Sequence, residues 1–199
     1  KRKFESGSGP LPDKMQNHSP LRGGDYHEAN DGRCRGLVEN FKIQRHLHFG
    51  GEHRTDIYEL DLSHPETGEP LNRTQATSIA VALRDALAAE LGIDTQEIGY
   101  EASKVMGQND KEEYRIFLYD EAGGGAGYAV QAQQYIDSLI EQARETLQCH
   151  DNECDKACHG CLLDYETRFE AEHLDRNEAL EILSESLLRA LKLPDEEAF

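Results

Sequence analysis

The sequence contains no tryptophan, only two methionines and five cysteines, and aromatic residues make up 7% of it. It lacks the run of about 20 apolar residues that a membrane-spanning helix requires. It also lacks a signal-peptide pattern at its start. These absences argue against a membrane partner and against a disulfide-bonded secreted domain. We therefore expect a cytoplasmic setting.

Positive charge is scarce outside the first quarter of the chain. Residues 1–54 carry ten Lys and Arg against seven Asp and Glu, whereas residues 55–199 carry 11 against 32, and the formal net charge is −18. An acidic surface repels the backbone of a nucleic acid. The charge is consistent either with a solvated acidic surface or with docking onto a basic partner.

The composition divides the chain into three segments. Residues 1–36 are rich in Gly, Pro, Ser and charge and offer few apolar groups, so we expect a flexible linker or N-terminal extension. Residues 37–193 are predicted to form one folded domain, and residues 194–199 a tail. Because the chain begins at Lys1, we expect a processed chain or part of a longer one.

Four segments are predicted to be strands. Alternating apolar residues indicate strands at 37–49 and 55–62, which we expect to pair as a hairpin across Gly50-Gly51. A short strand follows at 97–103. Residues 113–120 are apolar on both faces, which is typical of a central strand covered on both sides.

Three segments are predicted to be helices. The first carries Ile79, Leu83, Leu87 and Leu91 and ends at Gly92. The second spans roughly residues 128–147. The third follows the capping-box spacing of Asp175 and Glu178 and carries leucines as far as Leu191. We therefore predict an α/β domain, with helices packed on a mixed sheet of about four strands.

Four of the five cysteines lie in the polar segment CHDNECDKACHGC, with the spacing C-x4-C-x3-C-x2-C: Cys149, Cys154, Cys158 and Cys161. Four thiolates this close in sequence can surround one tetrahedral zinc ion, although an iron–sulfur cluster uses the same ligands. His150 or His159 could replace one thiolate, whereas Cys34 lies far away and is expected to be incidental.

A four-thiolate zinc site has no open position for water or substrate, so its role is structural. The surrounding loop is too polar to fold by apolar burial, and we expect the metal to fix the angle between the helices on either side. Gly160 is expected to let the backbone bend toward the ion.

The segment DEAGGGAGY, which begins at Asp120, joins a predicted strand to a predicted helix. It lacks the glycine and lysine pattern of nucleotide-binding loops. It therefore indicates either a tight turn or a backbone site for an anion. Asp120 could cap this turn or pair with an arginine. Alternatively, Asp120 and Glu121, with His173 as a further candidate, could hold Mg²⁺ in a nuclease or phosphodiesterase.

Three pieces of the sequence resemble the MrfA-like zinc-binding domain family. They are HRTDIYELDL from His53, IFLYDEAGGGAGY from Ile116, and the cysteine segment continued through CLLDY and HLDR, which contains His173, Asp175 and Arg176. The resemblance covers roughly residues 37–190. Members occur at the C-terminus of superfamily 2 DNA helicases, such as the MrfA repair helicase, and in the DrmB protein of the DISARM anti-phage system.

The resemblance implies that the four clustered cysteines bind zinc and that the chain works in DNA processing beside a helicase. We therefore expect a zinc-stabilised, non-catalytic accessory or interaction domain, acting in anti-phage defence or DNA repair, with a helicase or ATPase as partner and DNA contacted through the complex. Any ATPase would lie in another segment or subunit. The alternatives are the nuclease above and direct DNA binding through basic residues of the N-terminal part: Arg33, Arg35, Lys42 and Arg45.

Overall fold

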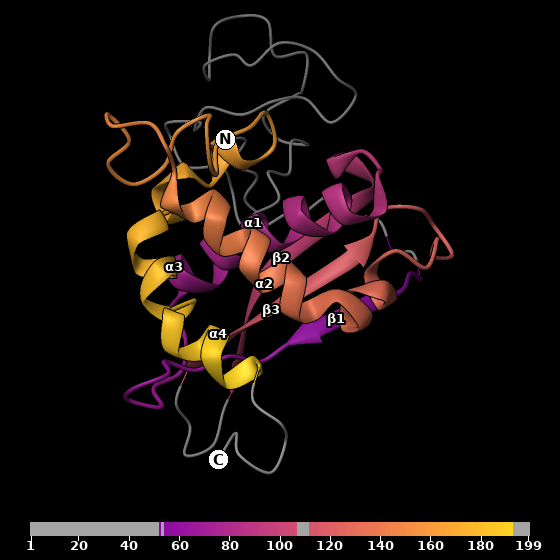
Figure 1. Ribbon diagram of the computed structural model, residues 1–199. Helices are drawn as coiled ribbons and strands as arrows, with labels where there is room; N and C mark the ends of the chain where they lie inside the picture. Colours follow the sequence, from indigo (N-terminus) through magenta and orange to yellow (C-terminus); the bar gives the residue numbers. More distant parts are fainter. Residues whose placement is uncertain (1–51, 53, 107–111, 193–199) are drawn as a thin grey trace, which may run out of the picture. The chain divides into compact units, whose positions relative to one another are not determined.

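The computed structural model describes residues 52, 54–106 and 112–192 (Figure 1). The described strands are β1 (Ile57–Leu60), β2 (Ile98–Met106) and β3 (Glu112–Asp120). The helices are α1 (Arg73–Leu91), α2 (Ala132–Gln148), α3 (Arg176–Ile182) and α4 (Glu185–Leu191), with short 3-10 turns between them. No helix among these residues is both long and apolar enough to cross a bilayer. The predicted α/β class is confirmed.

The described sheet has three antiparallel strands in the order β1-β3-β2. β3 is the central strand, with Tyr58 opposite Leu118 on one side and Tyr100 opposite Leu118 on the other. The predicted strand at 37–49 and its hairpin turn lie outside the described residues. The predicted central position of β3 is confirmed.

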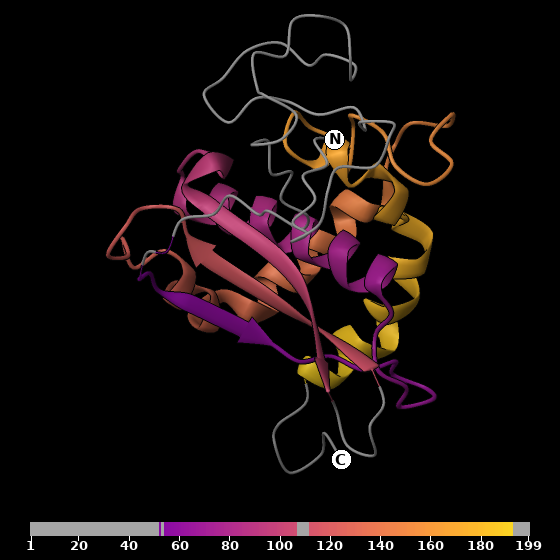
Figure 2. The same ribbon diagram turned by 180° about the vertical axis from the view of Figure 1, so that it is seen from behind.

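The two faces of the sheet differ, and the prediction that β3 is covered on both sides is wrong for the described residues. Ile116 and Leu118 are fully buried beneath the helices, whereas Phe117 and Tyr119 on the opposite face are only partly buried. Figure 2 shows this second face, with the described helices all behind the sheet. On this second face the Tyr119 ring lies across Gly99 of β2, where any Cβ would be only 2.2 Å from the ring.

Helix α1 lies between the sheet and the other helices. Asn72 and Gln75 form a reciprocal capping box at its start, and Gly92 ends it in the left-handed conformation with φ 65°. Its central residues, 76–88, are buried except for Asp85, because β2 and β3 cover one face while α2 and α3 cover the other. The alanines between its larger residues let these neighbours approach closely.

Helix α2 packs against α1 and buries Leu139, Ile140, Ala143 and Leu147, whereas Ile136 is only partly buried. The last predicted helix is in fact two helices. The chain leaves the helical conformation at Leu183, where ψ is 51°, and Ser184 caps α4 by accepting from the Leu187 N–H. Arg144 of α2 donates to the freed Leu183 carbonyl at 2.6 Å.

Candidate metal centre and its supports

The four clustered cysteines bring their sulfur atoms together at one point after α2. All four Sγ atoms lie within 4.8 Å of one another. The Cys149–Cys158, Cys154–Cys161 and Cys158–Cys161 sulfurs are 3.6, 3.8 and 3.9 Å apart. A tetrahedral ion with Zn–S bonds of about 2.3 Å requires sulfurs about 3.8 Å apart. The sulfur positions therefore fit a single tetrahedral zinc ion.

The backbone between the last two cysteines also supports this arrangement. The Cys158 N–H donates to the Cys161 sulfur at 3.3 Å, and the Gly160 N–H donates to the Cys158 sulfur at 3.2 Å. The backbone turns here as expected, since the Cys161 N–H donates to the Cys158 carbonyl at 3.0 Å. The turn does not require glycine, however, because Gly160 is not among the described glycines with positive φ. A Cβ there would lie 3.4 and 3.8 Å from the sulfurs of Cys158 and Cys149, which is ordinary contact.

The cysteines differ in acidity as thiols. Burial raises the pKa of Cys154 to about 12 and also raises the pKa of Cys161. The pKa of Cys149 is lowered, chiefly by a hydrogen bond from the Asp151 backbone. A divalent cation binds thiolates, so it must displace protons from the buried pair. Four thiolates would complete the coordination of zinc and leave no position for a substrate.

The two flanking histidines stand apart from the sulfur cluster. His150 and His159 are exposed, and the Nδ1 atom of His159 lies 3.0 Å from the Leu163 carbonyl oxygen. Neither belongs to the converging group, which consists of the four thiols alone. The cluster is therefore a candidate four-cysteine site, and no imidazole is needed to complete it.

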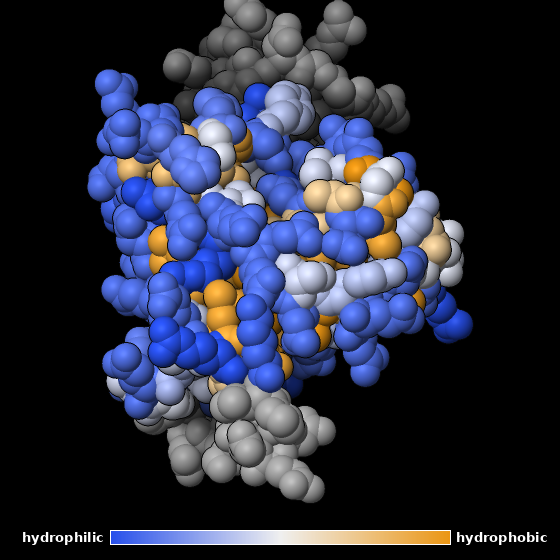
Figure 3. Space-filling model, viewed as in Figure 1, coloured by the Kyte–Doolittle hydropathy of each residue, from blue (hydrophilic) through white to orange (hydrophobic). Residues whose placement is uncertain are grey.

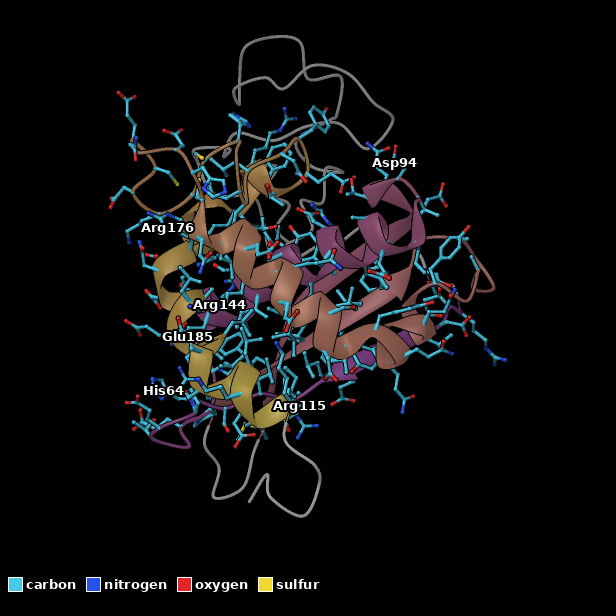
Figure 4. The ribbon with its side chains drawn as sticks, in the orientation of Figure 1. His64, Asp94, Arg115, Arg144, Arg176 and Glu185 are labelled. Atoms are coloured by element: carbon cyan, nitrogen blue, oxygen red, sulfur yellow. The ribbon has the colours of Figure 1, made fainter. Side chains whose placement is uncertain are left out.

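Arg176 connects the cysteine loop, residues 149–161, to the helices on both sides. From the start of α3, its guanidinium donates to the Leu147 carbonyl of α2 at 3.4 Å and to the Cys154 carbonyl at 3.0 Å. The backbone N–H of Arg176 donates to the Lys156 carbonyl at 2.8 Å. Figure 4 labels Arg176 at the end of α3 nearest this loop. The arginine of the HLDR motif thus satisfies carbonyls of α2 and of the loop together.

Asp175, which precedes Arg176, connects the start of α3 to α1. Its carboxylate accepts from the Asn177 and Glu178 N–H groups at the start of α3 and lies 3.3 Å from Lys156 Nζ. The predicted capping box is only half formed, because the Asp175 N–H donates to Ser78 of α1 at 2.8 Å rather than to Glu178. The cysteine loop, α1, α2 and α3 therefore meet at Asp175-Arg176.

The glycine loop after β3 encloses a carboxylate of the chain itself. The side chain of Asp120 is fully buried and accepts from the N–H groups of Ala126, Gly127, Tyr128 and Ala129 at 2.5 to 3.2 Å. The loop can turn so tightly because three of its glycines have positive φ: Gly124, Gly125 and Gly127. The backbone anion site is thus filled by Asp120, which confirms its predicted role in capping the turn.

The first motif of the sequence meets the same loop. Thr55 Oγ1 donates to the Asp120 carbonyl at 2.6 Å, and the Asp120 N–H donates to the Asp56 carbonyl at 3.2 Å. A Cβ on Gly125 would be 2.3 Å from the Asp56 carboxylate, so only glycine fits there. Thr55-Asp56 and the glycine loop are therefore in direct contact, although they are far apart in sequence.

The acidic residues considered for a nuclease do not form a metal site. The Asp120 carboxylate already accepts from four backbone N–H groups. Glu121 is exposed. The Nε2 atom of His173 lies 3.6 Å from the carboxylate of its neighbour Glu172. Over residues 54–106 and 112–192, the thiols are the one converging group of potential ligands. The basic residues considered for DNA binding, together with Cys34, lie outside the described residues.

Sequence reasoning missed a buried arginine beside this region. Arg84 of α1 is fully buried, and its guanidinium lies 2.7 Å from Asp85, 2.6 Å from Asp164 and 3.3 Å from Glu166. It also lies over the Tyr100 ring, 5.1 Å from the centroid. An arginine inside an alanine-rich apolar stretch was the available signal. The ion pairs attach the segment after the cysteine loop to the core.

Comparison with known proteins finds a family model and two proteins that resemble parts of this chain. Residues 79–162 match the family model described as the MrfA Zn-binding domain. The Druantia protein DruE from Escherichia coli (strain UMEA 4076-1) is 30% identical over 164 residues, which cover 73% of this chain and 8% of DruE. A crystal structure of the DUF1998 helicase MrfA bound to DNA is 17% identical with a TM-score of 0.46, and it covers 64% of this chain and 16% of that one. The chain thus spans less than a fifth of each of these proteins.

Proposed function

Because residues 79–162 match the MrfA Zn-binding domain model, we propose that Cys149, Cys154, Cys158 and Cys161 hold the zinc of this family. We further propose that the domain is a non-catalytic accessory or interaction module that works beside a DNA helicase. The observation that carries the proposal is the convergence of four sulfur atoms within 4.8 Å, between the end of α2 and the start of α3.

The non-catalytic assignment follows from how the motif residues are used. Thr55, Asp56 and Asp120 close the glycine loop, while Asp175 and Arg176 attach the cysteine loop to three helices. Each of these residues makes at least one hydrogen bond within the chain, although the Nε atom of Arg176 is buried without a partner. A zinc ion held by four thiolates offers no open position for water, so it would hold the fold and not activate a nucleophile.

The helicase partner and the biological setting are proposed on the family relationship. The family takes its name from MrfA, and DruE is a Druantia protein that contains a segment similar to this chain. We therefore place the module in the cytoplasm, in anti-phage defence or DNA repair, with DNA contacted through the complex. Domain limits of 37–193 are part of the proposal.

Affinity purification of the chain from its native host tests this function. We expect a DNA-stimulated ATPase to be recovered, either in the same polypeptide or as a stable partner, because the described residues offer no catalytic group of their own. A control purification would use an unrelated acidic protein of similar size. Recovery of the chain without any ATPase activity would contradict the proposal.

A further inference from the structure

Two aromatic side chains stand out from the surface after the cysteine loop. Tyr165 is 71% exposed and Phe169 is 76% exposed. Arg168 lies between them, with its guanidinium carbon 3.8 Å from the tyrosine centroid and 4.5 Å from the phenylalanine centroid. We call these three residues, with Glu170 and Glu172 beside them, the Tyr165–Phe169 surface. Figure 3 shows the face bearing α2, which is mainly hydrophilic.

This surface is held on a rigid support. Thr167, at its centre, is fully buried, donates to the Leu162 carbonyl at 2.8 Å and accepts from the Asp164 N–H at 2.8 Å. Asp164 also accepts from the Thr167 N–H at 2.7 Å and is paired with buried Arg84. The aromatic rings are therefore presented outward by a fixed backbone, which lowers the entropy lost when a partner binds.

The charges around the rings indicate what kind of partner would bind there. Glu172 is exposed and Glu170 partly exposed, and Glu170 contributes, after burial, to raising the pKa of Glu101 on β2. Exposed aromatic rings with an arginine are typical of the energetic centres of protein interfaces. Aromatic rings can also stack on single-stranded DNA, but such sites lie in positively charged grooves. The negative charge here opposes a phosphate backbone and favours a basic surface.

We propose that the Tyr165–Phe169 surface is the docking site for a basic protein surface, namely that of the helicase partner. This inference rests on the proposed function and adds the place and chemistry of the contact. The rings would enter an apolar depression on the partner, and Glu170 and Glu172 would face its lysines and arginines. Electrostatic complementarity of this kind speeds association and is weakened by salt.

Site-specific photo-cross-linking in the native host tests the surface. A benzophenone amino acid would replace Tyr165 or Phe169 and, as a matched exposed control, Met106, which is 66% exposed on β2. We expect both test positions to cross-link to one peptide with net positive charge, at a yield at least several-fold above that of Met106. Adding Glu170→Lys and Glu172→Lys should lower that yield several-fold, while the melting temperature changes little because both side chains lie at the surface.

Each other outcome contradicts the inference. These outcomes are cross-linking to DNA, to an acidic protein or to residues 1–54 of the same chain, a yield no higher than at Met106, and a yield unaffected by the charge reversals. If the ATPase co-purifies equally with a Tyr165→Ala/Phe169→Ala variant, the docking site is wrong while the proposed function stands. If the cross-linked basic protein is not a helicase, the partner named here is wrong, while the proposed function still depends on whether a DNA-stimulated ATPase is recovered with the chain.

Discussion

The core around α1 and the cysteine loop are stabilised in opposite ways. Ile79, Leu83 and Leu87 of α1 are at most 1% exposed, between the sheet on one side and α2 and α3 on the other. The cysteine loop is polar, and most of its residues between the sulfur ligands are exposed. The first region is held by apolar burial, whereas in the second we propose that the four cysteines bind a metal, and Arg176 adds hydrogen bonds.

This difference predicts which part of the fold depends on the metal. Apolar burial in the α1 core needs no ligand. Small structural zinc sites gain about 10–16 kcal/mol of apparent free energy on binding the metal. Loss of zinc should therefore release the cysteine loop and loosen α2 from α3 while the sheet and α1 persist. The predictions below test this separation, from the largest expected effect to the smallest.

Replacing one sulfur should have the largest effect on the loop. In Cys158→Ser, we expect loss of most of the bound zinc, and limited proteolysis should cut first between residues 149 and 163. The β2–β3 pair should keep its protection against amide hydrogen exchange. The matched control is Cys34→Ser, which removes a thiol outside the cluster. Equal digestion of the Cys158 variant and the wild type would contradict the structural role.

Shortening a buried side chain of α1 should destabilise the core around α1. Leu83→Ala leaves a cavity and should lower the free energy of unfolding by about 2–5 kcal/mol, measured by urea denaturation. Its zinc content in the folded state should stay normal. Val130→Ala, at a residue 48% exposed, is the control and should have a much smaller effect. Loss of zinc from folded Leu83→Ala protein would show that the two regions are not separate.

Removing the arginine that bridges the loop should weaken it without removing a ligand. Arg176→Ala leaves the Leu147 and Cys154 carbonyls without this donor and should cost about 1–3 kcal/mol. Zinc should still bind, but a chelator should extract it faster. Arg189→Ala, on the exposed surface of α4, is the control. An unchanged extraction rate would remove the proposed bridging role.

Acid should affect the attachment of residues 164–166 to the core. Burial acts to raise the pKa of Asp164, but hydrogen bonds from Thr167 and the charge of Arg84 outweigh it, so the pKa lies below its ordinary value of 3.8. Because the folded-state pKa is depressed, Asp164 contributes stability above pH 3.8 and loses it as the pH falls through the folded-state value. Asp164→Asn should therefore destabilise at pH 7, and the difference from wild type should shrink below pH 3.8.

Stability measured against pH for both proteins, with exposed Asp137→Asn as control, checks this prediction. A difference that stays constant from pH 7 to the acid transition would show that the carboxylate charge of Asp164 does not support the ion pair with Arg84.

The smallest effect is expected at Gly160. An alanine there would make ordinary contact with two sulfurs at an unstrained backbone position, so zinc content should be normal and stability should change by less than about 1 kcal/mol. Gly125→Ala makes the contrast, because it combines φ +80° with a Cβ 2.3 Å from Asp56 and should cost more. Thermal melting of both variants compares them, and a larger loss at Gly160 would contradict the described loop geometry.

Local signals predicted much of this structure. The helical period and Gly92 predicted the end of α1, and four cysteines within 13 residues predicted the sulfur cluster, because in both cases the interacting groups are close in sequence. The break before Ser184 was missed, because the leucine pattern continues unchanged across it.

Contacts over long sequence distances could not be predicted in the same way. Arg84 meets partners about 80 residues away, and Arg176 reaches carbonyls 22 and 29 residues away. The exposure of Phe117 and Tyr119 depends on which elements cover the sheet, which strand periodicity does not specify. Sequence therefore identified the groups that form the candidate site, while the structure identified the residues that hold it in place.

The most direct test is elemental analysis of freshly purified chain combined with X-ray absorption at the zinc edge. The account predicts one zinc ion per chain, with four sulfur neighbours at about 2.3 Å. Iron in place of zinc, a coordination shell containing nitrogen or oxygen, or protein that keeps its cysteine loop ordered without any metal would contradict it.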